Sequence, residues 1–167
     1  RHTKFRNVTG VQTCALPISD CADTQLVKEA MWDPFEYFVA RNRDGLLKTE
    51  FNHALGNVSY HIPCHSRVQN VGRKTADTLQ LIPDTKINVV ERCSGHAGTY
   101  GVKKEYHQMS MKIGKPVFKA MASEAPDYIS SDCQLAGHHI EQGMEVNGLK
   151  PAEMAHPLSL LRKAYGI

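Results

Sequence analysis

The stretch Ile-Asn-Val-Val at 87–90, followed by Arg-Cys-Ser-Gly-His-Ala-Gly-Thr-Tyr-Gly at 92–101, decides the fold of this chain. The first part is largely apolar and β-branched, which is typical of a buried strand. The second part is a glycine-rich turn that carries a thiol, and a long amphipathic pattern begins directly after it. A thiol in a turn between a strand and a helix lies where an α/β protein can hold a metal cluster or an anion.

The same arrangement occurs twice more along the chain. A strand-like run at 58–62 precedes Cys64 and a helical pattern at 71–82, and a short run at 127–131 precedes Cys133 and another helical pattern. Strands that alternate with helices are typical of right-handed crossovers and a parallel sheet. We therefore expect an α/β fold with three layers, in which helices flank a small parallel sheet and the cysteines lie at the carboxyl ends of strands.

Two helix starts are marked by the residues that precede them. Asp33-Pro34 places an N-cap residue before a proline at the first helical position, and Pro157 opens a last helix after His156. We expect His156 to have a structural role at that helix start.

The longest periodic stretch follows the glycine-rich turn. Its apolar residues recur at steps of three or four and are Val102, Tyr106, Met109, Ile113, Val117 and Met121. This spacing predicts one long amphipathic helix. Pro116 lies within it and predicts a kink or a restart, because proline removes a backbone donor and clashes with the preceding turn.

Composition narrows the class of protein. A length of 167 residues suits one domain, and 20 basic against 17 acidic residues give no support for a nucleic-acid-binding surface. Five cysteines, an odd number, argue against a disulfide framework and favour a reduced, cytoplasmic compartment. No apolar run approaches the length of a transmembrane segment.

The N-terminal segment differs from the rest of the chain. Residues 11–19 show neither helical nor strand periodicity, and they resemble translated adapter sequence that contaminates assembled genomes. We therefore expect residues 1–20 to be non-native or disordered, 21–56 to form a helical lead-in and 57–167 to form the cysteine-rich α/β domain. The natural protein is expected to continue upstream.

The three strand-end cysteines form the candidate site. Because the carboxyl ends of parallel strands meet at one edge of a sheet, Cys64, Cys93 and Cys133 are expected to share that edge. Thiolates are soft ligands that suit iron–sulfur clusters and zinc. Gly95 and Gly98 would let the backbone approach a bound cofactor closely. The alternative is that the three thiols are unconnected core residues.

Two other uses of the turn have less support. Its glycines could hold a phosphate, but no lysine–serine or dinucleotide-binding pattern is present. A histidine could activate Cys93 as a catalytic nucleophile, but no third orienting group stands out.

Four motifs together resemble a known family. They are His-Ile-Pro-Cys-His at 61–65, Cys-Ser-Gly-His-Ala-Gly-Thr-Tyr-Gly-Val-Lys-Lys-Glu at 93–105, Ser-Asp-Cys at 131–133 and His-Pro-Leu-Ser-Leu-Leu at 156–161. In this order, over about residues 23–167, they resemble the cysteine-rich "Cys-Cys-Gly" domain found in the C subunit of anaerobic glycerol-3-phosphate dehydrogenase, in heterodisulfide reductase and in lactate-utilisation iron–sulfur proteins.

The resemblance implies a non-catalytic electron-transfer subunit. Such a subunit would carry an iron–sulfur cluster of the 4Fe-4S type and would pass electrons from flavin-containing dehydrogenase subunits toward quinone or another membrane-associated acceptor. It would be cytoplasmic and peripheral at the inner face of the membrane.

The chain departs from the family motif at two positions. Ser94 replaces the second of two adjacent cysteines, and Ala136 replaces the last cysteine of a Cys-x-x-Cys pair. Three interpretations stay open. A cluster could use the three thiolates with a fourth ligand, for which His96 is the first candidate beside His65, His138 or solvent. A Cys3His set suits zinc. The domain could also have lost its cofactor and serve as a structural or interaction domain.

Overall fold

A small parallel sheet forms the centre of the molecule. The computed structural model describes residues 22–98, 101–150 and 152–167. The strands are β1 (Gly56–His61), β2 (Thr85–Val90), β3 (Tyr128–Ser131) and β4 (Glu153–Met154). Their order in the sheet is β2-β1-β3-β4, and each of the three pairings is parallel. The predicted parallel sheet is confirmed.

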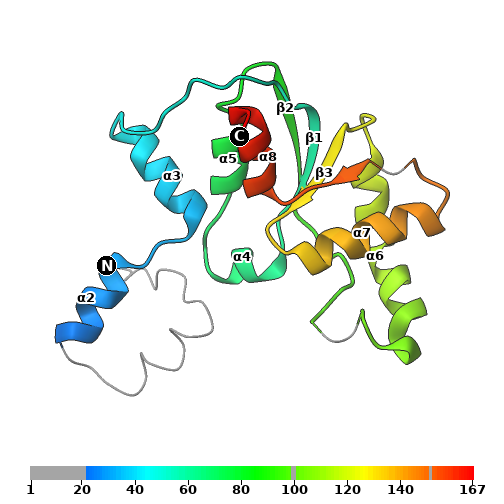
Figure 1. The fold of residues 1–167 in the computed structure, drawn as a ribbon. Helices are drawn as coiled ribbons and strands as arrows, with labels where there is room; N and C mark the ends of the chain where they lie inside the picture. The colour runs from blue at the N-terminus through cyan, green and yellow to red at the C-terminus, as the bar shows by residue number, and fades with distance from the viewer. Residues whose placement is uncertain (1–21, 99–100, 151) are drawn as a thin grey trace.

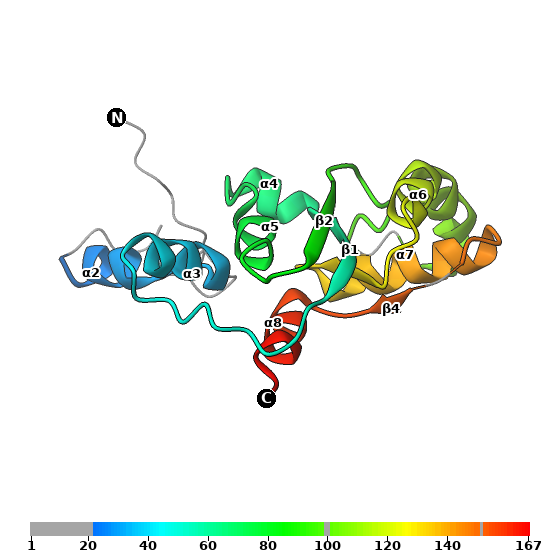
Figure 2. The same ribbon diagram turned by 90° about the horizontal axis from the view of Figure 1, so that it is seen from above.

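Helices cover both faces of this sheet. They are α2 (Ala22–Ala30), α3 (Pro34–Arg43), α4 (Cys64–Val68), α5 (Lys74–Leu79), α6 (His107–Ala122), α7 (Gln134–Val146) and α8 (Pro157–Tyr165), with a 3-10 turn η1 at Lys104–Tyr106. Helices α5 and α8 lie on one side of the strands, with α3 beyond them, and α6 and α7 lie on the other (Figures 1 and 2). The three-layer α/β architecture is therefore confirmed.

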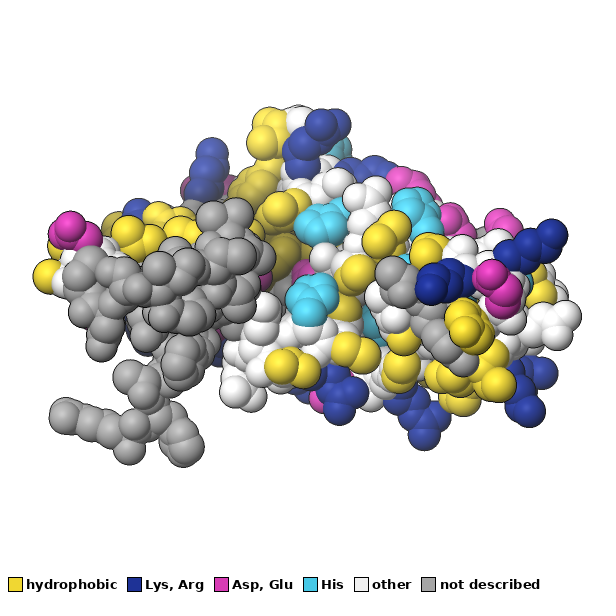
Figure 3. Space-filling model, turned by 90° about the horizontal axis from the view of Figure 1, so that it is seen from below, with side chains coloured by type: hydrophobic (Ala, Val, Ile, Leu, Met, Phe, Trp, Pro, Cys, Tyr) yellow, Lys and Arg dark blue, Asp and Glu magenta, His cyan; other side chains and the backbone are white. Residues whose placement is uncertain are grey.

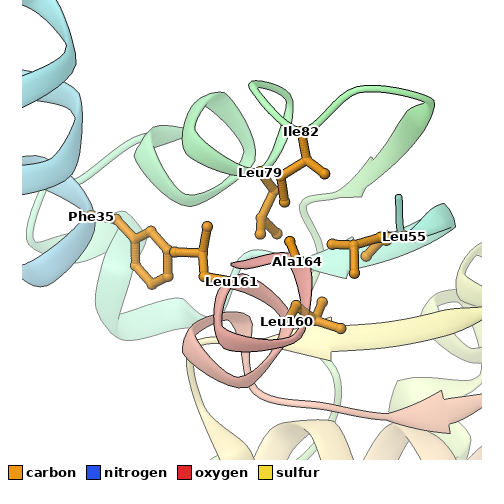
Figure 4. Close-up of a cluster of buried hydrophobic side chains, with 8 residues drawn as sticks. Phe35, Leu55, Leu79, Ile82, Leu160, Leu161 and Ala164 are labelled. Atoms are coloured by element: carbon orange, nitrogen blue, oxygen red, sulfur yellow. The ribbon is translucent and has the colours of Figure 1, made fainter. Parts of the chain in front are cut away.

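The core on the α5 and α8 side joins distant parts of the chain. Its buried side chains come from α3, the segment before β1, β1 itself, α5 with the turn after it, and α8. Most of them are labelled in Figure 4, and the full set is Phe35, Leu55, Val58, Leu79, Ile82, Leu160, Leu161 and Ala164. Apolar burial of this extent is the main stabilising contribution to such a layer. It also anchors the helical lead-in to the sheet through Phe35.

The core on the opposite face is organised around Phe118. This fully buried side chain lies between Gly114 of its own helix α6 and Gly143 of α7, and a Cβ atom added at either glycine would come within 2.3 Å of its ring. The two helices can therefore pack closely only because both positions lack a side chain.

Helix α6 differs from its prediction in start and orientation. It begins at His107, after η1, and continues through Pro116 without a restart. Its solvent-facing side includes Met109 and Ile113, which are 52% and 44% exposed, whereas Ser110 is fully buried. The prediction of the helix was correct. Its apolar repeat identified the buried face only in the second half of the helix, where Val117 and Met121 are each 1% exposed.

The predicted helix caps are confirmed. The Asp33 carboxylate accepts hydrogen bonds from the backbone N–H groups of Phe35 at 2.9 Å and Glu36 at 3.3 Å. The ring of His156 accepts from the backbone N–H of Leu158 at 3.2 Å, so His156 has the structural role expected of it. Both contacts satisfy donors that the first turn of a helix leaves free.

Candidate metal centre

The three strand-end cysteines lie at the carboxyl edge of the sheet. Cys64 and Cys93 follow the last residues of β1 and β2 by three positions, and Cys133 follows β3 by two. Strand β1 lies between β2 and β3, so the segment with Cys64 emerges between the other two. Figure 3 shows this side of the molecule, where several histidine side chains gather among apolar ones.

Two of these thiols are direct neighbours. The side chains of Cys64 and Cys93 are close enough to share a hydrogen bond, and both residues are exposed and free of disulfides. Partial burial of its sulfur, followed by the charge and hydrogen bond of Cys93, raises the pKa of the Cys64 thiol, and the nearby guanidinium of Arg67 lowers it. A soft metal ion that displaced both thiol protons would relieve this mutual destabilisation of the thiolates.

The third thiol approaches from the other side of β1. Cys133 is partly exposed and is the N-cap residue of α7, and its backbone N–H donates to the Ser131 hydroxyl at 3.4 Å. In residues 22–98, 101–150 and 152–167, no group of three or more His, Cys, Asp or Glu side chains is arranged to hold a metal ion. The structure therefore joins two of the thiols and places the third at the same edge, and their use in one site stays a prediction.

A partly buried carboxylate, that of Asp132, supports the Cys133 segment. Asp132 accepts hydrogen bonds from the Tyr60 hydroxyl and, at 3.0 and 3.1 Å, from the Thr75 hydroxyl. Burial raises the pKa of Asp132, and the two donors oppose that shift. Burial and the Asp132 charge also raise the pKa of Tyr60. These contacts tie the residue before Cys133 to both β1 and α5.

A second polar network supports the Cys93 loop. The Ser110 hydroxyl of α6 donates to the Gly95 carbonyl at 2.8 Å and lies 3.0 Å from His139 Nε2 on α7. Since the hydroxyl has a single hydrogen, His139 Nε2 must donate to it and carries a proton. Burial, together with the neighbouring His96 and His107, lowers the pKa of His139.

The predicted glycines have different surroundings. Gly95 has a φ of +84°, and a Cβ atom there would lie 2.3 Å from the Ser110 carbonyl oxygen. Glycine at this position is thus required by the packing of the loop on α6. Gly98 also has a positive φ, +63°, but a Cβ atom at that position would have no other atom within 4 Å.

The predicted fourth ligand is placed toward α6 and α7. His96 is buried, and its ring centre lies 5.9 Å from that of His139. His65 and His138 are exposed, and His138 Nδ1 pairs with Glu141 at 3.1 Å. The two positions at which the family motif has cysteine are also buried, because Ser94 is 5% and Ala136 is 4% exposed. The role of His96 as a ligand stays a prediction.

A basic cavity adjoins the thiol pair. It has a volume of about 370 Å³ and is lined by Ile62, Arg67, Asn70, Gly72, Arg73 and Glu91. Arg67 Nε lies 3.0 Å from the Glu91 carboxylate, an ion pair at the surface. The charge of Arg67 lowers the pKa of the Cys64 thiol, but burial and Cys93 outweigh it.

Sequence patterns assigned no supporting role to the polar side chains that hold the cysteine segments, although the motif at 131–133 includes Ser131 and Asp132. These side chains are Tyr60, Thr75, Ser110, Ser131, Asp132 and His139. The feature of the sequence that could have drawn attention to them is their position, because several of them lie near a strand end or directly before a predicted ligand. Sequence alone cannot show that a polar residue at such a position is buried and paired.

Comparison with known families settles the class of domain. The model of the cysteine-rich domain family, CCG, matches residues 58–141, a span that contains all three strand-end cysteines. The chain belongs to the cysteine-rich domain family. This cysteine-rich domain is 33% identical over 108 residues to the C subunit of anaerobic glycerol-3-phosphate dehydrogenase from Escherichia coli K12, and equally to that from Escherichia coli O157:H7. The suspected resemblance is confirmed.

The matched region is a small part of those relatives. It covers 64% of this chain and 26% of each relative, so the chain spans about a quarter of their length. No solved structure matches the cysteine-rich domain. Among its described helices, none has the length and apolar character needed to cross a membrane.

Proposed function

We propose that this cysteine-rich domain holds an iron–sulfur cluster at Cys64, Cys93 and Cys133 and transfers electrons within an oxidoreductase complex. The observation that carries the proposal is the adjacency of the Cys64 and Cys93 thiols at the ends of two paired parallel strands. Cys133 follows the strand on the other side of β1. Thiolates are the ligands that iron–sulfur clusters use, so the three cysteines have the chemistry that a cluster needs. Two of them, Cys64 and Cys93, are also close enough together to bind it.

The residues of the chain would bind and orient the group. Cys64, Cys93 and Cys133 would supply thiolates, with His96 as the candidate fourth ligand. A bound cluster would supply reversible one-electron transfer. The N-terminal turn of α7 directly follows Cys133, and its free backbone N–H groups would offset negative charge at this edge. Gly95 and Gly98 would allow the loop after Cys93 to lie near the group.

The partners follow from the relatives. Because the chain is similar to a subunit of anaerobic glycerol-3-phosphate dehydrogenase, we assign it a non-catalytic role in passing electrons from flavin-containing dehydrogenase subunits toward quinone or another membrane-associated acceptor. The domain would work on the cytoplasmic side of the membrane. Because Ser94 and Ala136 stand at two motif positions, the proposed cluster is one with an incomplete set of cysteine ligands.

Anaerobic reconstitution tests the proposal. The full chain is incubated with ferrous iron and sulfide, and bound iron and sulfide, visible absorption and EPR after reduction are measured. A cluster of the 4Fe-4S type predicts about four iron atoms per chain. Cys64→Ser, Cys93→Ser and Cys133→Ser should each lower the iron content, whereas Cys14→Ser and Cys21→Ser, outside the matched region, should not. Folded protein that stays colourless and free of iron would contradict the proposal.

A zinc-stabilised structural domain is the second candidate. The observation that favours it is the reduced ligand set, since Ser94 and Ala136 leave three thiols at the edge. Zinc bound at one equivalent, with thermal stability lost on chelation, would support this candidate. A chain with Ser94→Cys and Ala136→Cys separates the two interpretations, because it should bind more iron only if the edge is a cluster site.

A further inference from the structure

One buried histidine connects the strand ends around the candidate centre. His61 is the last residue of β1 and is 1% exposed. Its Nδ1 lies 3.1 Å from the Ser131 hydroxyl at the end of β3, and its Nε2 lies 2.8 Å from the Arg92 carbonyl beyond the end of β2. A single side chain therefore contacts the segments that lead to Cys93 and Cys133, while its own strand leads to Cys64.

The direction of these hydrogen bonds is determined by their partners. A backbone carbonyl can only accept, so His61 Nε2 carries the proton and donates to Arg92. In the neutral ring Nδ1 then accepts from the Ser131 hydroxyl, and the same hydroxyl oxygen accepts from the backbone N–H of Cys133. Burial lowers the pKa of His61, which supports the neutral form. The result is a continuous chain of hydrogen bonds from Cys133 to the residue before Cys93.

This connection lies where the backbone ladder ends. His61 is the last residue of β1 in register with both neighbours, opposite Val90 and Ser131, and one more backbone bond joins Ile62 N–H to the Val90 carbonyl at 3.0 Å. Arg92 lies two residues after Val90, beyond the backbone ladder, and there the His61 imidazole provides its contact to β1. The ring thus extends the alignment of the strands to the residues next to the thiols.

The burial of an imidazole here calls for a reason beyond packing. A buried polar ring without partners is costly, and an apolar side chain could fill the same space without that cost. Both ring nitrogens are paired, and both partners belong to cysteine-bearing segments. An apolar residue could not hold two segments at a set separation through directional bonds.

We propose that His61 is the positioning residue of this site, which sets the separation of Cys93 and Cys133 on the two sides of β1 so that their thiols can join Cys64 at one metal centre. The inference rests on the proposed function and assigns to one side chain the task of assembling its ligands. His61 itself does not bind the metal, since both of its ring nitrogens are used by Arg92 and Ser131.

The first test measures thiol separation without any metal. In a full chain with Cys14, Cys21 and Cys64 replaced by serine, dibromobimane can cross-link only Cys93 to Cys133, and the rate is followed by fluorescence and mass spectrometry. His61→Phe should reduce the cross-linking rate about tenfold or more, because removal of supporting contacts typically lowers site function 10- to 100-fold. His61→Gln, which can still donate to Arg92, and His61→Asn, which can still accept from Ser131, should fall between wild type and His61→Phe.

The second test uses cobalt as a spectroscopic probe. Co²⁺ is added to the chain with only Cys14 and Cys21 replaced, and its thiolate charge-transfer absorption reports how many sulfurs bind. His61→Phe should weaken Co²⁺ binding about 10- to 100-fold and lower this absorption. Val58→Ala is the matched control, since Val58 is buried on the same strand and packs in the core away from the cysteine segments. It should lower the melting temperature and leave both readouts unchanged.

The outcomes separate the two proposals. In the background with three serines, equal cross-linking rates with and without His61→Phe would overturn the positioning role. So would the absence of cross-linking in that background when His61 is intact. A rate that depends on His61 in a protein that binds neither iron nor cobalt would uphold the positioning role and overturn the cluster function. Should His61→Phe not fold, His61→Gln and Ser131→Ala pose the same question, because each removes only one of the two bonds.

Discussion

The thiol of Cys64 lies beside the thiol of Cys93, and the two share a hydrogen bond at the carboxyl edge of the sheet. They come from strands paired in parallel, so the adjacency is a direct consequence of the register in which His61 lies opposite Val90. Because of this contact, the pKa of the Cys64 thiol depends on Cys93, and this dependence can be measured.

Removal of Cys93 should make Cys64 more acidic. Cys93 raises the pKa of Cys64, so Cys93→Ser should lower that pKa and speed alkylation of Cys64 by iodoacetamide at about pH 7.5. Arg67→Gln removes a lowering influence and should slow the same reaction. The two rates should therefore change in opposite directions. Rates that move together in both variants would contradict the described arrangement.

Loss of the Tyr60 hydroxyl should destabilise the fold. Tyr60→Phe leaves the partly buried Asp132 with Thr75 as its remaining described donor. Because a hydrogen bond to a charged group is stronger than one between neutral groups, the free energy of unfolding should fall by about 2 kcal/mol. Urea denaturation measures it. Tyr37→Phe, at an exposed aromatic ring, is the control and should change the value by less than about 0.5 kcal/mol.

Two glycines in the Cys93 loop should respond differently to alanine. Both have positive φ, so either substitution should cost about 1 kcal/mol in backbone strain. Gly95→Ala should cost about 1–3 kcal/mol more, because its Cβ atom would meet the α6 backbone, whereas Gly98→Ala meets no atom. Thermal denaturation of both variants checks the difference, and equal losses would show that the loop does not pack on α6 as described.

Stability should decline with acidity below pH 6.5 in a way that depends on His61. Burial lowers the folded-state pKa of His61 below its ordinary value of 6.5, so this histidine's contribution is fully present above pH 6.5. As pH falls, the unfolded chain binds a proton first, and the free energy of unfolding drops by at most about 1.4 kcal/mol per pH unit until the folded-state pKa is reached.

Urea denaturation at about pH 7.5, 6.5 and 5.5 measures this decline. His61→Gln should show a smaller decline than wild type over the same range, although His139, whose pKa is also lowered, contributes to both curves. Identical slopes in the two proteins would mean that His61 is not buried in its neutral form.

The order of elements along the chain could be predicted, and with it the edge of the sheet at which the three cysteines lie. Strand-like runs before Cys64, Cys93 and Cys133, each followed by a helical pattern, require parallel strands, and parallel strands end on one side of a sheet. The cap at Asp33 was predictable for a similarly local reason. An aspartate before a helix can accept hydrogen bonds from the backbone N–H groups that the first turn leaves free.

The buried face of α6 could be predicted from its repeat only in part. Val117 and Met121 are buried, as the repeat predicts. Tyr106, Met109 and Ile113 have the same spacing but lie exposed, while Ser110 is buried. A serine can occupy the core here because its hydroxyl pairs with Gly95 and His139, which belong to other elements. Periodicity records which residues share a face of a helix, but the face that is covered depends on the neighbours that cover it.

By itself, then, the sequence determined an α/β chain of the cysteine-rich domain family with three thiols at one edge of a parallel sheet. Only the tertiary structure decided that β1 lies between β2 and β3, that Cys64 and Cys93 are immediate neighbours, and that His61 and Asp132 hold the adjoining segments. The physical reason is range. Strand and helix patterns follow from local steric and apolar periodicity. Strand order and buried polar pairs instead depend on residues 15 to 72 positions apart that meet only in the folded chain.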